Sequence, residues 1–322
     1  MPVIEIRDPR SGSSAKVATH LGFNCYAFHA ILADGRGIDV LESAEDFPQG
    51  GHRPSARGIP ILFPYPNRIA DGKFSWDGKA YHIPPVVAAY DASGNAIHGF
   101  CLDRVWRITA QDPSSVTGHF QLSIDAPDRL PYWPADFLLE IRYTVRDASL
   151  RADIRIANPS AENLPWGFGT HPYFQLPLAA SSQPEQCLIE VPCAETWELI
   201  DCIPTGRLLP VTEKTDLRDG EYFGLAKFDD VLTGLPAGVH EQSMSIWDEP
   251  AGLRMVQRCD PIFREIVVYT PPQRSAVCLE PYTCVTNAIN MAGGEAATGW
   301  RTLAPGGELT TWIDIACERI IV

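Results

Sequence analysis

The sequence predicts an all-β protein that folds as a large antiparallel two-sheet sandwich. Three observations support this prediction. Apolar and polar side chains alternate with a period of two along several segments, turn-forming residues separate those segments, and long amphipathic helical patterns are scarce. The chain has 28 prolines and 25 glycines among its 322 residues, a composition that suits many short strands joined by turns.

The individual elements follow from this alternation and from the turn residues between the alternating segments. The predicted strands cover residues 115–124, 137–145, 150–156, 254–256 and 309–315. Turns are expected at residues 77–78, 112–113, 147–149 and 305–307. Residues 286–291 are expected to form one short helical turn, and the proline-rich segments 58–66 and 164–177 are expected to be ordered loops. Because no linker or change in composition divides the chain, we expect a single domain over residues 1–322.

The overall charge and the cysteine content exclude several classes of protein. A formal net charge of -14 argues against nucleic acid or an anionic membrane as the main partner. The nine cysteines are scattered without a C-x-x-C pair, which fits neither a zinc ribbon nor a disulfide framework. The N-terminal residues lack the pattern of a secretion signal, and no apolar stretch is long enough to span a membrane. We therefore expect a cytoplasmic protein in a reducing environment.

Two histidines and one glutamate are the strongest candidates for chemistry. His98 precedes a glycine, His171 lies among aromatic residues before a proline, and Glu280 ends a short apolar run. Each also has a structural interpretation, as a surface-turn histidine, a hydrogen-bonded core imidazole and an exposed edge-strand charge, respectively. Together they supply groups for proton transfer in two directions. The same three residues would equally suit iron or zinc if the fold brought them together.

Two further polar sites are candidates for ligand binding. Arg68 lies in a proline-rich loop, where its guanidinium suits recognition of hydroxyls or anions, although a solvated loop arginine is the alternative. Asp229 and Asp230 form a doublet of the kind that usually caps turns. Dinucleotide-binding, phosphate-loop, serine-hydrolase and H-E-x-x-H motifs do not occur in the sequence.

Four stretches of the chain resemble the aldose 1-epimerase (galactose mutarotase) family and occur in that family's order. They are residues 58–69 with 72–74 and 78–81, residues 96–100, residues 169–174, and residues 268–271 leading into 279–283 and Asn287. Residues 303–307 then introduce a last strand, as in those proteins. The resemblance spans about residues 20 to 318. It implies a galactose mutarotase-like β-sandwich, known as a supersandwich, with a sugar-binding cleft on one sheet.

The resemblance also implies an activity, the interconversion of the α and β anomers of a free hexose such as galactose or glucose. By resemblance, Glu280 is the general base, His171 is the general acid, and His98 holds and polarises the substrate. The implied substrate-binding residues are Arg68, Asn67 and Asp229, with Asp230 as the alternative to Asp229. No metal or organic cofactor is expected, and the expected partner is a monosaccharide bound by a monomer or homodimer. If the two catalytic charges lie close together, the pKa of His171 should rise.

Three other functions are left open by the sequence. A hexose-6-phosphate 1-epimerase would need cations near the sugar's C6, and the candidates are Arg53, Arg57, Lys73 and Arg104. A glycoside hydrolase would need a second carboxylate beside Glu280, for which Asp229 is the candidate. A non-catalytic sugar-binding protein would have no need of an acid–base pair. The aromatic faces of Trp166 and Tyr173 are candidates for packing against a pyranose, with core packing as the alternative.

Overall fold

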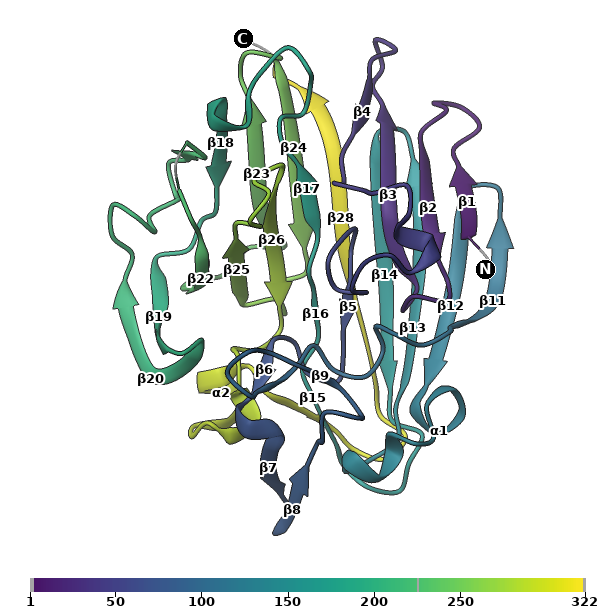
Figure 1. The fold of residues 1–322 in the computed structure, drawn as a ribbon, viewed down its shortest axis with the longest axis vertical. Helices are drawn as coiled ribbons and strands as arrows, with labels where there is room; N and C mark the ends of the chain where they lie inside the picture. Colours follow the sequence, from purple (N-terminus) through teal and green to yellow (C-terminus); the bar gives the residue numbers. More distant parts are fainter. Residues whose placement is uncertain (1–2, 225, 321–322) are drawn as a thin grey trace.

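The computed structural model describes residues 3–224 and 226–320, and its strands form two packed layers (Figure 1). One layer is a single antiparallel sheet, which we call the back sheet. Its strands among the described residues are, in spatial order, β11 (Arg107–Asp112), β12 (Ser115–Gln121), β13 (Leu138–Arg146), β14 (Ser149–Ala157), β28 (Glu308–Arg319), β24 (Leu253–Cys259), β23 (Gln242–Asp248), β18 (Cys187–Glu190) and β21 (Glu221–Tyr222).

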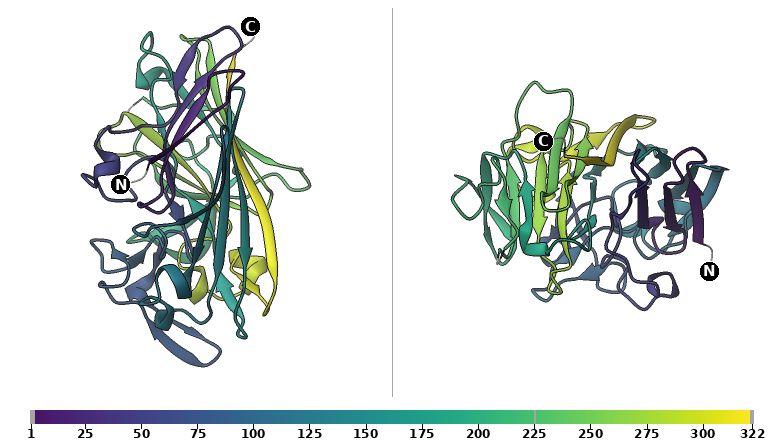
Figure 2. Two further views of the ribbon diagram at one scale, coloured as in Figure 1. Left: turned by 90° about the vertical axis from the view of Figure 1, so that its right-hand side faces the viewer. Right: turned by 90° about the horizontal axis from the view of Figure 1, so that it is seen from above.

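The second layer consists of two sheets that lie side by side against the back sheet (Figure 2). The front sheet contains β20 (Ile203–Pro210), β19 (Glu195–Ile200), β22 (Asp229–Thr233), β25 (Glu265–Tyr269), β26 (Ala276–Tyr282), β16 (Gly169–Thr170) and β5 (Ile61–Leu62), with β17 (Tyr173–Gln175) also paired to β26. The N-terminal sheet contains β1 (Val3–Arg7), β2 (Ser14–Ala18), β3 (Asn24–Ile31) and β4 (Gly37–Asp39).

Smaller elements close the ends of the two layers. The short sheets are β6 (Arg68–Ile69) with β10 (Ala96–Ile97) and β9 (Ala89–Tyr90), β7 (Lys73–Trp76) with β8 (Lys79–His82), and β15 (Leu164–Trp166) with β27 (Arg301–Leu303). The helices are α1 (Leu122–Asp125) and α2 (Gly294–Thr298), and the 3₁₀ turns are η1 (Phe47–Gln49), η2 (Ala70–Gly72), η3 (Leu130–Tyr132), η4 (Pro184–Gln186) and η5 (Ala288–Asn290). None of the described helices is long and apolar enough to cross a membrane.

The core lies between the layers, and alternation along the strands explains why. In β13, Leu139, Ile141, Tyr143 and Val145 are buried while Arg142 between them is exposed, as expected for a strand with one face on the core. In β26 every residue is buried, because protein covers both faces of this central strand. One hydrophobic cluster draws members from both layers, between residues 6 and 317. We propose on this basis that residues 1–322 form one domain.

The all-β fold class predicted from the sequence is confirmed, and each predicted strand overlaps an observed one. The strand expected over residues 115–124 ends earlier, at Gln121, because Asp125 accepts a hydrogen bond from the Gln121 N–H and residues 122–125 turn into α1. The helical turn expected at 286–291 is the 3₁₀ turn η5.

The prediction that residues 58–66 and 164–177 form only loops is wrong. These segments contribute β5, β15, β16 and β17, each of two or three residues. Strands this short show no period-two pattern. They form because other strands supply backbone partners: β26 for β16 and β17, β27 for β15, and β16 for β5. Each of the nine cysteines lies in the described residues and is a free thiol.

Candidate active site

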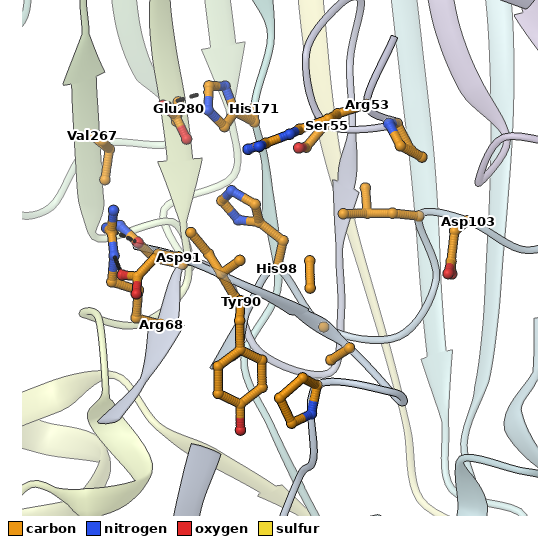
Figure 3. Close-up of a pocket in the computed structure, with 18 of the residues that line it drawn as sticks. Arg53, Ser55, Arg68, Tyr90, Asp91, His98, Asp103, His171, Val267 and Glu280 are labelled. Carbon is orange, nitrogen blue, oxygen red and sulfur yellow. Dashed lines mark hydrogen bonds and ion pairs between the residues drawn. The ribbon is translucent and has the colours of Figure 1, made fainter. Parts of the chain in front are cut away.

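A cleft of about 730 Å³ opens on the face of the front sheet, within the size range of small-molecule sites. Residues of β22, β25 and β26 line one wall, and residues of β6, β9 and the turn after β10 line another. Figure 3 shows Glu280 and His171 in contact on this cleft, with His98 facing them and Arg68 beside Asp91. All six residues predicted to bind or convert substrate, His98, His171, Glu280, Asn67, Arg68 and Asp229, line the cleft.

The register of the front sheet brings Glu280 and His171 together although they are far apart in the sequence. Gly169 pairs with Tyr282 and Tyr173 with Cys278, so the position between them, His171, lies across from Glu280. Side chains at such facing positions of antiparallel strands are neighbours. The Nδ1 atom of His171 accordingly lies 3.4 Å from Oε1 of Glu280.

Glu280 is almost fully buried, with an exposed fraction of 1%. Burial raises the pKa of its carboxyl well above the ordinary value, and the nearby charge of Asp229 raises it further. The hydroxyl of Tyr282 donates a hydrogen bond of 2.5 Å to Oε2 of Glu280, which acts in the opposite direction by stabilising the carboxylate. Glu280 is thus a carboxyl whose proton affinity is tuned by two opposing effects.

Two tyrosines hold the imidazole of His171. The ring of Tyr173 stacks on it with centroids 4.7 Å apart and planes within 1°, and Tyr269 meets it edge-on at 5.9 Å. The hydroxyl of Tyr173 donates to the carbonyl of Ser55, which anchors the stacked ring. Burial lowers the pKa of His171 to about 3.

This lowered pKa corrects the expectation that the neighbouring carboxylate would raise the pKa of His171. Desolvation penalises both charged forms, and it dominates because both side chains are nearly enclosed. In the unliganded protein, burial therefore favours a protonated Glu280 beside a neutral His171. An ion pair between the two side chains has the same number of protons, so it forms by moving one proton within the pair.

His98 is placed by a strained turn that only a few residue types tolerate. Its φ is 68°, and Gly99 follows with a φ of 75°. A Cβ atom on Gly99 would lie 2.1 Å from the carbonyl oxygen of Phe63, so glycine is required there. The His98 ring lies 5.6 Å from the ring of His171, and its Nδ1 is buried without a hydrogen-bond partner among the described residues. Burial also lowers the pKa of His98 well below its ordinary value.

Arg68 reaches the cleft because β6 pairs with β10, the strand that ends just before His98. Nε of Arg68 donates to Asp91 at 2.7 Å and its Nη1 donates to Asn67 Oδ1 at 2.5 Å. Although burial opposes ionisation, hydrogen bonds from Asn95 and Arg68 keep the pKa of Asp91 below its ordinary value. The guanidinium is thus oriented before any ligand arrives, which lowers the cost of binding.

The two members of the aspartate doublet have different positions. Asp229 lies opposite Tyr269 in the sheet and lines the cleft. Asp230 is not among the described residues that line it, because successive side chains of a strand point to opposite faces. The aromatic candidates also separate, since Tyr173 lines the cleft whereas Trp166 is a core residue.

Sequence reasoning missed several residues that shape the site. Tyr282 could have been found, because it lies two positions after Glu280 in a strand and therefore shares its face. Asp91 carries a weaker signal, an Asp-x-Ser-x-Asn turn in which its side chain accepts hydrogen bonds from the N–H groups of Ser93 and Asn95. Tyr269 gives no local signal, since its role depends on strand pairing.

Of the four cations proposed for a phosphate site, only Arg53 lines the cleft in the part of the chain that the structure describes. Arg57 forms an ion pair with Glu42 at 2.8 Å, and Arg104 pairs with Asp128. Lys73 is exposed on β7, away from the cleft lining.

Comparison with known proteins agrees with this architecture. A family model described as aldose 1-epimerase matches residues 31–316. The Escherichia coli (strain K12) protein YihR is 24% identical over 71% of each chain. The galactose mutarotase of Rattus norvegicus is 30% identical over 151 residues, which are 45% of this chain and 40% of the rat protein.

Solved structures show the same fold. A galactose mutarotase-like protein from Clostridium acetobutylicum superposes with a TM-score of 0.86 over 99% of both chains at 21% identity. The galactose 1-epimerase from Lactobacillus acidophilus NCFM superposes with a TM-score of 0.72 over 99% of both chains at 14% identity. Taken with the family model, which covers most of the sequence, the fold and the cleft lead to one conclusion: the chain belongs to the aldose 1-epimerase family.

Proposed function

We propose that this protein interconverts the α and β anomers of a free hexose, such as galactose or glucose, by opening and reclosing the pyranose ring. The observation that carries this proposal is the contact between Glu280 and His171 on the wall of a cleft. A carboxyl with a raised pKa beside an imidazole with a lowered pKa is typical of groups that exchange protons with a substrate.

The reaction needs one proton removed and one added at neighbouring oxygens. The carboxylate of Glu280 takes the proton of the C1 hydroxyl while protonated His171 donates a proton to the ring oxygen. The C1–O5 bond breaks, the resulting aldehyde rotates about C1–C2, and the ring oxygen attacks its other face. Each proton then returns, which leaves both side chains as they began. Positioned acids and bases of this kind each contribute roughly 10²–10⁴-fold.

The substrate itself supplies the polar contacts that make the ion pair favourable. In the unliganded site, burial favours the protonated carboxyl and the neutral imidazole. Sugar hydroxyls next to both groups replace the solvation lost on burial, so the proton moves from Glu280 to His171 when substrate binds. His98, which is neutral at pH 7, is suited to hydrogen-bond the substrate beside His171.

The remaining polar side chains are proposed to orient the sugar. Arg68, fixed by Asp91 and Asn67, presents its guanidinium to ring hydroxyls. Asp229 approaches from the neighbouring strand β22 and accepts hydrogen bonds from the sugar hydroxyls. A bound monosaccharide is thus the proposed partner. Nine free thiols favour a reducing compartment, which supports a cytoplasmic location.

The cleft favours a free hexose over the alternatives. Among the described residues of the cleft, a 6-phosphate would meet one cation outside an ion pair, Arg53, on a protein with a net charge of -14. A retaining or inverting hydrolase needs one neutral acid and a second carboxylate. Glu280 and the candidate second carboxylate Asp229 both line the cleft, but a hydrolase would have no use for the histidine in contact with Glu280. A protein that only bound sugars would gain nothing from a buried glutamate and histidine in contact.

Polarimetry of freshly dissolved α-D-galactose and α-D-glucose tests the proposal. The wild-type protein should accelerate the approach to equilibrium, and Glu280→Gln and His171→Asn should each slow it by about 100-fold or more. Asp230→Asn is the matched control, since this half-buried carboxyl lies outside the described cleft lining. Wild-type rates in either catalytic variant, or faster turnover of glucose 6-phosphate than of glucose, would contradict the assignment.

A further inference from the structure

A buried thiol lies directly against the catalytic pair, and the proposed proton transfers do not use it. Cys278 is two residues before Glu280 on β26, so the two side chains share a face of the strand. It pairs across the sheet with Tyr173 on one side and Tyr269 on the other, the two residues whose rings hold His171. Its side chain has no exposed surface.

The donor atoms of His171, Cys278 and Glu280 form a compact group. One nitrogen, one sulfur and one oxygen from these side chains all lie within 4.8 Å of one another. Zinc bonds of roughly 2.0–2.3 Å in a tetrahedral arrangement place ligand atoms about 3.5 Å apart. The His171 to Glu280 separation of 3.4 Å already has this value, so small side-chain rotations complete the set.

An unsatisfied nitrogen provides independent evidence for a ligand at this place. Nδ1 of His171 is buried and has no hydrogen-bond partner among the described residues, and it points toward Glu280. Buried polar atoms in folded proteins are nearly always paired. Although the geometry toward Glu280 does not satisfy a hydrogen bond, a metal ion between the three side chains would coordinate this lone pair.

We propose that His171, Cys278 and Glu280 form a binding site for one thiophilic divalent ion of the zinc and cadmium type, and that the bound ion blocks the active site. Nitrogen, thiolate and carboxylate donors are those that such ions select over calcium or magnesium. The thiolate and carboxylate together neutralise the two positive charges, and the displaced protons of the Cys278 thiol and the Glu280 carboxyl leave to solvent. The remaining coordination position faces the cleft, because His171 and Glu280 line it.

Blocking follows from the shared atoms. An ion held by Glu280 and His171 occupies the lone pairs that would take and carry protons, so sugar turnover and metal binding exclude each other. This inhibitory part of the inference rests on the proposed function, whereas the binding part does not. Cys278 contributes a ligand to the ion without a role in the sugar chemistry, which makes it the residue of choice for a test.

Titration of the reduced full-length protein with Cd²⁺, followed by the ultraviolet charge-transfer band of cadmium thiolate, tests the site directly. The wild type should show a band that saturates at one equivalent and disappears when excess Zn²⁺ is added. Cys278→Ala should weaken Cd²⁺ binding by more than about tenfold, since loss of even an outer-shell partner of a metal costs roughly 10–100-fold. Cys202→Ser is the matched control, because Cys202 is the one cysteine of intermediate exposure and hence the most accessible thiol for adventitious binding.

Two further measurements keep the inference testable if Cys278→Ala does not fold. Cys278→Ser preserves the size of the side chain, and X-ray absorption of the Zn²⁺-loaded wild type should show one sulfur ligand beside nitrogen and oxygen. An unchanged band in a folded Cys278 variant, a band lost in Cys202→Ser, or zinc without a sulfur ligand would overturn the site. If Cd²⁺ binds as described but the protein does not interconvert anomers, the metal site stands and the proposed function fails.

Discussion

Removing the hydroxyl of Tyr282 should change the pH at which the pair of Glu280 and His171 loses its shared proton. This hydroxyl donates a 2.5 Å hydrogen bond to Glu280, and it opposes the increase in pKa that burial causes. A hydrogen bond to a charged group is worth about 1.5–3 kcal/mol, and about 1.4 kcal/mol corresponds to one pKa unit. In Tyr282→Phe the pKa of Glu280 should therefore rise by about one to two units.

The sign of the effect follows from the one proton that the pair shares. The active form of the free enzyme carries that proton on Glu280 or His171, and the rate falls at alkaline pH, where Glu280 loses it. The alkaline limb of the kcat/KM profile for galactose should therefore move to higher pH by about one to two units. Below that limb the variant should be about 10–100-fold slower, because less of the pair is in the ionised form, and at alkaline pH it should approach the wild type. Polarimetric rates across the pH range measure this shift. Tyr143→Phe, which alters a buried tyrosine of the back sheet, is the control. An unshifted alkaline limb in Tyr282→Phe would refute the reasoning.

Three other perturbations test the supports of the site. Gly99→Ala should lower the free energy of unfolding in urea by about 3 kcal/mol or more, because the added Cβ would lie 2.1 Å from a carbonyl oxygen. Gly94→Ala should lower it by only about 1 to 2 kcal/mol, because Gly94 has a φ of 88° but open space around it. Equal losses of stability in the two variants would contradict the geometry. Asp91→Asn should raise KM for galactose about tenfold with little change in kcat, since it releases the guanidinium of Arg68, and an unchanged KM would argue against that support. In the wild type, the unfolded state takes up a proton at His171 as the pH falls below 6.5 while the folded state does not until about 3, so stability is lost on acidification. His171→Asn should lack this loss. As the pH falls from about 6 to about 4, the stability of the variant relative to the wild type, measured by urea titration, should rise by about 1.4 kcal/mol per pH unit. A difference that stays constant with pH would mean that the buried histidine is charged in the folded protein.

The strands that form the back sheet could be predicted from the sequence because each buries one face. Leu139, Ile141, Tyr143 and Val145 record that burial as a period of two. The short strands near the cleft could not, since two or three residues contain no period and form only because strands distant in the sequence pair with them. The order of strands in the front sheet is likewise a matter of long-range pairing that no local pattern encodes.

The candidate site shows the same division between local and long-range information. The residues proposed from the motifs line one cleft. Residue type and turn context singled out the histidines and Glu280, whereas their proposed roles, and Asn67 as a binding residue, came from the family resemblance. The proximity of His171 and Glu280 depends on a strand register set by Gly169 with Tyr282 and by Tyr173 with Cys278. Their pKa directions depend on burial, a property of the whole fold, and the sequence-based expectation for His171 was wrong for this reason.

The central claim is that Glu280 and His171 together move protons between the C1 hydroxyl and the ring oxygen of a free sugar. Exchange NMR at equilibrium between the anomeric protons of α- and β-galactose measures this reaction directly. Wild-type protein should give strong exchange peaks that disappear in Glu280→Gln, and it should give none with methyl galactosides, whose C1 oxygen has no proton to remove. Exchange that survives in Glu280→Gln, or that occurs with the methyl glycosides, would contradict the account.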